Sequence, residues 1–157
     1  MYIDHNIKAD NNGNDLPLVS IITVVFNNVD FIRNAIESVL SQIYPNVEYL
    51  VIDGGSTDGT VEIIKEYKDK ITFFLSEPDE GVYDALNKGI KKVTGIIVGI
   101  LHSDDLFSDN KVIIDMVNKM SEEKSEICFS DLVVLDKANG KIIRFYMAHY
   151  YKKWLFR

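Results

Sequence analysis

With 157 residues, 46% hydrophobic and 26% charged, the chain is long enough for one domain with a substantial core, and its composition is that of an ordinary globular protein. Its net charge of −7 disfavours general nucleic-acid binding, because a phosphate backbone must be met by clustered Lys and Arg. The only cysteine, Cys128, lies in an apolar stretch and excludes an internal disulfide and any multi-cysteine zinc site.

The first residues carry no targeting signal. Residues 1–16 are rich in Asn and Asp, which predicts a disordered tail ahead of a folded domain that begins at Pro17. They have neither the basic nor the apolar region of a signal peptide, and no apolar run approaches the ~18 residues of a membrane helix. We therefore expect a cytoplasmic protein.

Strand-like and helix-like segments then alternate along the chain. Residues 18–26 form a continuous run rich in β-branched side chains, which predicts a strand buried on both faces, and the apolar spacing of residues 31–40 predicts a helix. The same pair of segments recurs three more times, at 47–53 with 59–69, 71–75 with 82–93, and 95–101 with 110–120. Four such units predict an α/β fold, a mostly parallel sheet flanked by helices on both faces.

The alternation of strand-like and helix-like segments ends after residue 127. Two strand-like runs flank Ala138, Asn139 and Gly140, a turn signal that predicts a C-terminal antiparallel hairpin. We expect one domain over residues 17–146, followed by an aromatic and basic segment, 147–157. Such a segment packs against the remainder of its own protein or, since Trp, Tyr and Lys favour the interface, docks on a membrane surface. Its short length and unclear helical pattern favour packing.

Ligands of open parallel sheets bind beyond the carboxyl ends of the strands, and polar residues follow each predicted strand here. Asn27 and Asn28 follow the first, and residues 53–59, 76–81 and 102–105 follow the others. The resulting edge is acidic. A phosphorylated ligand would be repelled there unless a divalent cation stood between the charges.

Two adjacent carboxylates, Asp104 and Asp105, end the apolar run 96–101, which we expect to be a buried central strand. They are tolerable together if one coordinates Mg²⁺ or Mn²⁺ and the other accepts hydrogen bonds from a ligand hydroxyl. Alternatively, with Ser108 and Asp109 they form a solvated loop that caps the next helix.

Asp53 also has two interpretations. A carboxylate that ends the second strand of a βαβ unit can bind a ribose or a base edge. Alternatively, DGGSTDGT is a glycine-rich loop that caps the following helix. The turn after the first strand, VVFNNVDF, contains no glycine, which disfavours NAD and FAD, and a Walker A sequence is absent.

Four stretches taken together are more specific than any one of them. VSIITVVFNN, VEYLVIDGGSTDGT, SEPDEGVYDALNKGI and GILHSDDLF, in this order, resemble the nucleotide-binding half of family 2 glycosyltransferases. These are inverting enzymes of the GT-A fold that build bacterial surface polysaccharides. The resemblance covers about residues 17–135, nearly all of the predicted domain.

The resemblance assigns roles to individual positions. Asp53 would accept a hydrogen bond from the base, with a uracil N–H favoured, and Asp104 would hold the ribose or diphosphate side. Asp105 would be the metal ligand, with Mg²⁺ or Mn²⁺ bridging to the diphosphate. The nucleotide-sugar-binding positions it implies are Thr23, Val25, Asn27, Asp53, Gly81, Ala85, Asn87 and Asp104.

The catalytic residue is not identified. An acceptor hydroxyl would attack the anomeric carbon opposite the diphosphate, and a carboxylate base would take its proton. In this family the base lies in a later segment, so the chain resembles the donor half of a longer enzyme, acting on a saccharide or lipid-linked acceptor. Asp131 is the one weak candidate for the base, with a structural or ligand-positioning role favoured.

Two other functions stay open. One is a catalytically inactive nucleotide-sugar-binding module. The other is a nucleotidyltransferase of similar topology, disfavoured because VVFNNVDF lacks the glycine-rich basic loop of such enzymes.

Overall fold

The computed structural model describes residues 8–9 and 15–148. The chain forms two compact units, Met1–Ile114 and Asp115–Arg157, which are described separately below. This division falls inside the single domain, 17–146, that the sequence predicts, and that domain boundary stays a prediction.

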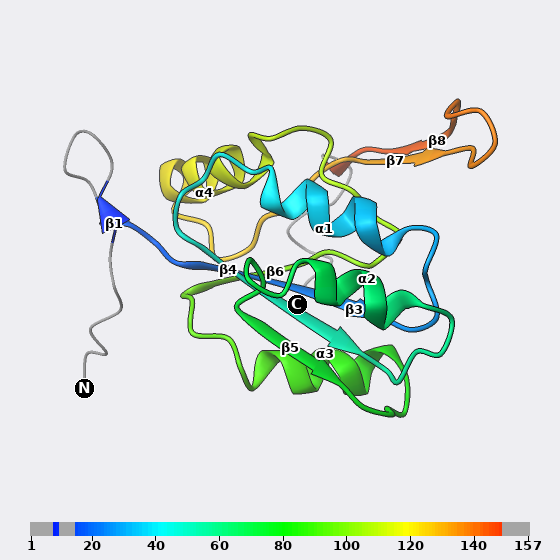
Figure 1. Ribbon diagram of the computed structural model, residues 1–157. Helices are drawn as coiled ribbons and strands as arrows, with labels where there is room; N and C mark the ends of the chain where they lie inside the picture. The colour runs from blue at the N-terminus through cyan, green and yellow to red at the C-terminus, as the bar shows by residue number, and fades with distance from the viewer. Residues whose placement is uncertain (1–7, 10–14, 149–157) are drawn as a thin grey trace. The chain divides into compact units, whose positions relative to one another are not determined.

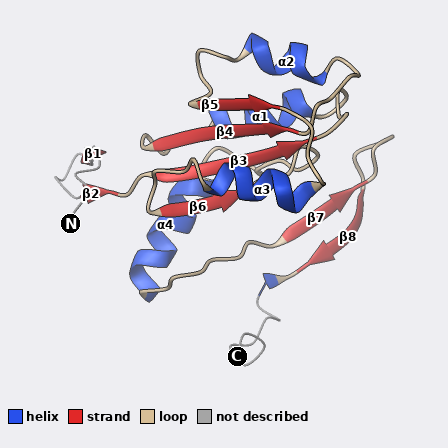
Figure 2. Ribbon diagram, turned by 90° about the horizontal axis from the view of Figure 1, so that it is seen from below, coloured by secondary structure: helices blue, strands red, loops and turns tan. Residues whose placement is uncertain are grey.

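The first unit is built on a four-stranded parallel sheet. Its strands lie side by side in the order β5, β4, β3, β6 (Figure 2). All neighbours are parallel, which confirms the predicted sheet, and the register aligns the ends of the three strands β3, β4 and β5. The bounds are β3 Val19–Val25, β4 Val47–Asp53, β5 Phe73–Ser76 and β6 Ile97–Ile100.

Helices cover both faces of this sheet. Figure 1 shows α1 (Ile32–Leu40) on one face and α3 (Val82–Ile90) on the other. Helix α2 (Thr60–Glu66) packs beside α1, where Arg33 forms an ion pair with Glu66 and a hydrogen bond to the hydroxyl of Tyr67. Each strand–helix unit of the sequence is thus present.

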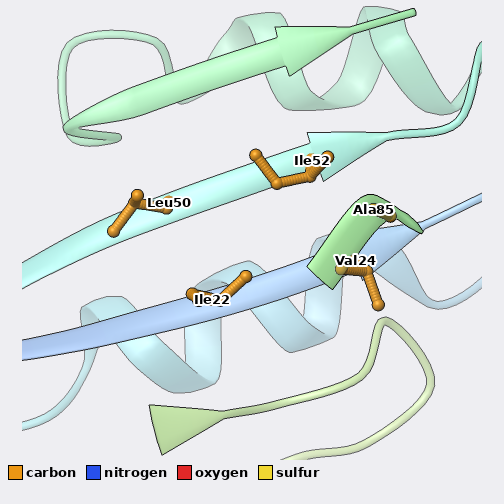
Figure 3. Packing of buried hydrophobic residues seen from close by; sticks show 5 residues of the cluster. All are labelled: Ile22, Val24, Leu50, Ile52 and Ala85. Carbon is orange, nitrogen blue, oxygen red and sulfur yellow. The ribbon is translucent and has the colours of Figure 1, made fainter. Parts of the chain in front are cut away.

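The core lies on the two central strands, β3 and β4, which are buried on both faces, and for β3 this confirms the prediction from its continuous run of β-branched side chains. The face under α3 is a cluster of small and branched side chains, Ile22, Val24, Leu50, Ile52 and Ala85 (Figure 3). A Cβ added at Gly89 of α3 would lie 2.8 Å from Cγ2 of Ile22, so this glycine lets the helix approach the sheet closely.

Strand β6 differs from its prediction. Within the part of the chain that the structure describes, β6 is hydrogen-bonded only to β3 and is therefore an edge strand. Alternate side chains are exposed: Ile96 is 71% exposed, Val98 45% and Ile100 50%. The expectation of a buried central strand was wrong because an apolar run does not reveal whether a second neighbour covers it.

Little of the predicted disordered tail can be described. Strand β1 (Lys8–Ala9) pairs antiparallel with β2 (Asp15–Leu16), and residues 1–7 and 10–14 lie outside the described residues.

The second unit contains a hairpin. Helix α4 (Val112–Glu123) begins three residues before the boundary of this unit at Asp115. The hairpin consists of strands β7 (Leu132–Leu135) and β8 (Ile142–Tyr146), which pair antiparallel. The turn closes through a hydrogen bond from the Gly140 amide to the carbonyl of Asp136, with Gly140 at φ 69°. The predicted hairpin is thus confirmed, whereas residues 149–157 of the predicted aromatic and basic segment lie outside the described residues. No described helix combines the length and apolarity needed to cross a membrane.

Candidate functional site

Asp53, the last residue of β4, is the centre of a hydrogen-bond network at the carboxyl edge of the sheet. Its side chain is completely buried. Oδ2 accepts from the amides of Gly55 (3.1 Å) and Ser56 (3.0 Å) and from the hydroxyl of Ser76 (2.6 Å), and Oδ1 accepts from the Ser56 hydroxyl. Both carboxylate oxygens therefore bind groups of the protein itself, and they tie the loop after β4 to the end of β5.

The loop after β3 is tied to both of its neighbours. The Asn27 amide donates to the Ser56 hydroxyl (2.8 Å), and the Asn27 side-chain oxygen accepts from the Thr57 amide (2.8 Å). On the other side, the side-chain amide nitrogen of Asn28 donates to the hydroxyl of Ser103 (2.8 Å), a residue that follows β6. The four strand ends therefore form one connected edge.

Asp58 holds the start of α2. Its carboxylate accepts from the amide and hydroxyl of Thr60 and from the amide of Val29, and the hydrogen bond with the Thr60 hydroxyl, above all, lowers the pKa of Asp58. The helix-start role proposed for DGGSTDGT is thus filled by Asp58, at a different position from Asp53.

A cavity of about 440 Å³ opens at the ends of β3, β4 and β5, lined by Phe26, Gly54, Gly55, Pro78, Asp79 and Gly81. Gly81 has φ 113°, a conformation that side chains other than glycine rarely adopt, and a Cβ there would meet open space. Of the residues that the resemblance assigns to the nucleotide-sugar, only Gly81 lines this cavity.

The acidic pair lies at the end of β6, on the opposite side of β3 from the cavity. Asp104 is exposed and Asp105 is half-buried. Burial, and then the neighbouring charge of Asp104, raise the pKa of Asp105, with His102 acting in the opposite direction. The capping role is taken by Asp109, whose Oδ1 accepts from the Lys111 amide (2.7 Å) ahead of α4.

The carboxylate pair fits a hard cation in its chemistry. Burial and the neighbouring charge of Asp104 raise the pKa of Asp105 by disfavouring its ionised form, and a cation beside the carboxylate would favour that form. Carboxylate oxygens are also the protein ligands that Mg²⁺ and Mn²⁺ prefer. Among the described residues no group of three or more His, Cys, Asp or Glu side chains could hold a metal ion. Mg²⁺ commonly takes one or two protein carboxylates together with water and phosphate oxygens.

Three other predicted positions have their side chains in the core. Thr23 is fully buried, and its hydroxyl accepts from the hydroxyl of Tyr49 (3.0 Å). Val25 and Ala85 are 5% and 2% exposed. Asn87 is exposed on α3 and does not line the cavity. The ligand contacts assigned to these residues stay predictions, and those of Thr23 and Val25 would be made by the backbone.

Asp131 is bound within the second unit. Its Oδ1 accepts from the amide of Ala148 (2.7 Å), so the carboxylate joins the two ends of the hairpin. This hydrogen bond is a structural contact, and the ligand-positioning role and the role as a base stay predictions.

Sequence reasoning missed the hydrogen bonds that occupy Asp53 and the placement of Phe26 and Asp79 beside the cavity. Each of these residues stands at or just after a predicted strand end, so the rule for ligand sites in parallel sheets was the signal that could have found them.

The fold and this edge define a parallel α/β domain with a ligand site beyond the carboxyl ends of its strands. The profile of Glycosyl transferase family 2 matches residues 20–155. The chain belongs to that family.

Its relatives are longer proteins. An uncharacterized glycosyltransferase of Rickettsia bellii is 40% identical over 141 residues, which cover 87% of this chain and 20% of the relative. An uncharacterized glycosyltransferase of Mycobacterium tuberculosis is 38% identical over 132 residues, covering 80% of this chain and 50% of the relative. The chain thus spans a fifth to a half of the length of these two relatives.

Solved structures show the same fold. The mannosyltransferase PcManGT from Pyrobaculum calidifontis, in complex with GDP-Man and Mn²⁺, matches 76% of this chain and 36% of its own with a TM-score of 0.64 and 23% identity. Staphylococcus aureus TarS 1–349, in complex with UDP-GlcNAc, matches 79% of this chain and 36% of its own with a TM-score of 0.63 and 25% identity. The GT-A fold that the sequence resemblance implies is confirmed.

Proposed function

We propose that this chain binds a nucleotide-diphosphate sugar, with a UDP-sugar favoured, as the donor half of an inverting, metal-dependent glycosyltransferase. The observation that carries the proposal is the connected edge of four strand ends, with a cavity on one side of β3 and an acidic pair on the other. Membership of Glycosyl transferase family 2 supports it, as does the UDP-GlcNAc bound by TarS.

The proposal assigns a position to each part of the donor. The cavity at the ends of β3, β4 and β5 would take the base, and the diphosphate would cross the end of β3 toward Asp104 and Asp105. Asp105 would hold Mg²⁺ or Mn²⁺, while Asp104 faces the ribose or the diphosphate. Once bound, the cation would neutralise the negative charge that the leaving diphosphate gains.

In the transfer step a hydroxyl oxygen of the acceptor forms a bond to the anomeric carbon while the bond from that carbon to the diphosphate oxygen breaks, and a base takes the hydroxyl proton. The acceptor is a saccharide or a lipid-linked saccharide in surface polysaccharide synthesis. A lipid-linked acceptor would bring the protein to the inner face of the membrane as a peripheral protein.

A catalytically inactive nucleotide-sugar-binding module is the second candidate. The observation that favours it is the hydrogen bond between Asp131 and the Ala148 amide, which engages the one weak candidate for a base. Incubation with labelled UDP-sugars and a panel of saccharide and lipid-linked acceptors tests this second candidate. Acceptor-dependent turnover by this chain would contradict an inactive module, whereas metal-dependent donor binding without turnover fits both an inactive module and a donor half whose base lies in a later segment.

The binding proposal is tested by calorimetry with UDP in the presence of Mn²⁺ and in the presence of EDTA. We expect much tighter binding with Mn²⁺, and we expect Asp105→Ala to abolish that difference, because an uncompensated carboxylate edge repels a diphosphate. Asp69→Ala makes the same change of charge on an exposed residue between α2 and β5 and should leave the metal effect intact. Equal UDP affinity with and without Mn²⁺ would contradict the metal site, and no UDP binding in either buffer would contradict the proposal as a whole.

A further inference from the structure

Asp79, in the loop between β5 and α3, borders the cavity without being part of the Asp53 network. Its Oδ1 accepts from the amide of Gly81 (2.8 Å), and Oδ2 has no hydrogen bond within the described part of the chain. A Cβ added at Gly54 would lie 2.5 Å from this Oδ2. The carboxylate therefore lies directly against the backbone of Gly54, in the space that a larger residue would occupy.

Asp53, in contrast, is closed off from the cavity. Four donors of the protein bind its carboxylate, three at Oδ2 and one at Oδ1, and the residue has no exposed surface. A base N–H could reach Asp53 only if the residues that bury it moved. Asp79 presents a carboxylate oxygen at the cavity without that cost.

The other residues around the cavity suit a flat aromatic ring. Phe26 is 62% exposed although it directly follows a buried strand, and the ring of Pro78 borders the same cavity. An exposed aromatic side chain offers a stacking face for a base, as in single-stranded nucleic-acid complexes. The glycines at 54 and 55 leave backbone rather than side chains on the remaining wall.

We propose that Asp79 determines the base specificity of this site by accepting a hydrogen bond from the N3–H of uracil. This inference rests on the proposed function and reassigns the base contact from Asp53 to Asp79. A carboxylate accepts hydrogen bonds and donates none, so it selects a ring that presents an N–H. Uracil carries a hydrogen on N3, whereas N3 of cytosine is itself an acceptor and would face the carboxylate unfavourably.

The test is calorimetry of residues 1–157 with UDP and CDP in the presence of Mn²⁺, with circular dichroism to check the fold of each variant. The wild type should prefer UDP. Asp79→Asn keeps Oδ1 for the Gly81 amide but presents an NH₂ group to the base, so UDP should bind about tenfold to a hundredfold more weakly, the usual effect of losing a hydrogen bond to a charged group. CDP should bind as well as before or better, because N3 of cytosine can accept from that NH₂ group.

Two further variants sharpen the result. Glu80→Gln removes the adjacent exposed carboxylate, which does not line the cavity, and should leave the ratio of UDP to CDP affinity unchanged. Gly54→Ala displaces the Asp79 carboxylate without changing its charge and should lower that ratio as Asp79→Asn does.

The possible failures are distinguishable. If the wild type binds UDP with Mn²⁺ but Asp79→Asn and Glu80→Gln change the ratio equally, the inference is overturned and the proposed function stands. A wild-type preference for CDP over UDP also overturns the inference alone. Absence of any nucleotide binding overturns both.

Discussion

Replacement of Asp53 tests whether this residue positions the loops of the site or contacts the base. Asp53→Ala removes the acceptor of two backbone amides, those of Gly55 and Ser56, and of the hydroxyls of Ser56 and Ser76. The hydroxyls can rotate toward other acceptors, but the amides are fixed. Since a buried donor without an acceptor costs about 1–3 kcal/mol and these amides are only half-buried, we expect a loss of about 2–3 kcal/mol in the free energy of unfolding.

Asp53→Asn provides the graded comparison. One side-chain oxygen remains for the two amides, and the Ser56 hydroxyl can accept from the new NH₂ group, so we expect a loss of about 1 kcal/mol. Urea denaturation followed by far-UV circular dichroism measures both variants.

Nucleotide binding gives the decisive result for Asp53. A positioning role predicts that Asp53→Ala weakens UDP and CDP binding by similar factors, because the loop that is released contributes backbone at Gly54 and Gly55 to the cavity and contacts no particular base. If the variant kept its stability to within about 0.5 kcal/mol, the range of an ordinary surface substitution, and lost affinity for UDP alone, the reasoning would be refuted and Asp53 would contact the base directly.

Two further predictions concern the packing of the sheet. Buried Glu48 accepts hydrogen bonds from the Ser20 hydroxyl and from the amide of Thr94. Burial alone would raise the pKa of Glu48, but the hydrogen bonds to its carboxylate have the larger combined effect and lower the pKa. Because the pKa of Glu48 is lower in the folded than in the unfolded state, its ionised carboxylate stabilises the fold above about pH 4.5, and this contribution is lost as the pH falls. Glu48→Gln should therefore lower the free energy of unfolding by about 2 kcal/mol at pH 7 and flatten the fall in stability below about pH 5. Urea denaturation at a series of pH values measures both effects. Gly89→Ala places a Cβ 2.8 Å from Ile22, and overpacking of about 1–3 kcal/mol should exceed the helix-propensity gain of about 1 kcal/mol; a melting temperature at or above the wild-type value would contradict this.

The local pattern of the sequence determined the kind and order of the elements of the first unit. The continuous, β-branched-rich run at residues 18–26 correctly predicted that β3 is buried on both faces, because only a central parallel strand can hide apolar side chains on both sides. The same reasoning located the functional edge, since the carboxyl ends of parallel strands meet on one side of a sheet.

Only the tertiary structure decided which partners each residue meets. Strand β6 has the same apolar character as β3, yet it lies at the edge of the described sheet, because neighbours in a sheet come from distant parts of the chain. Asp53 has the sequence context of a ligand-binding carboxylate, but Ser76, 23 residues later, occupies one of its oxygens. The contact between Asp79 and Gly54 likewise depends on the pairing of β4 with β5. Periodicity records only which way a side chain points along its own element, whereas hydrogen-bond partners depend on long-range register, which single residues do not encode.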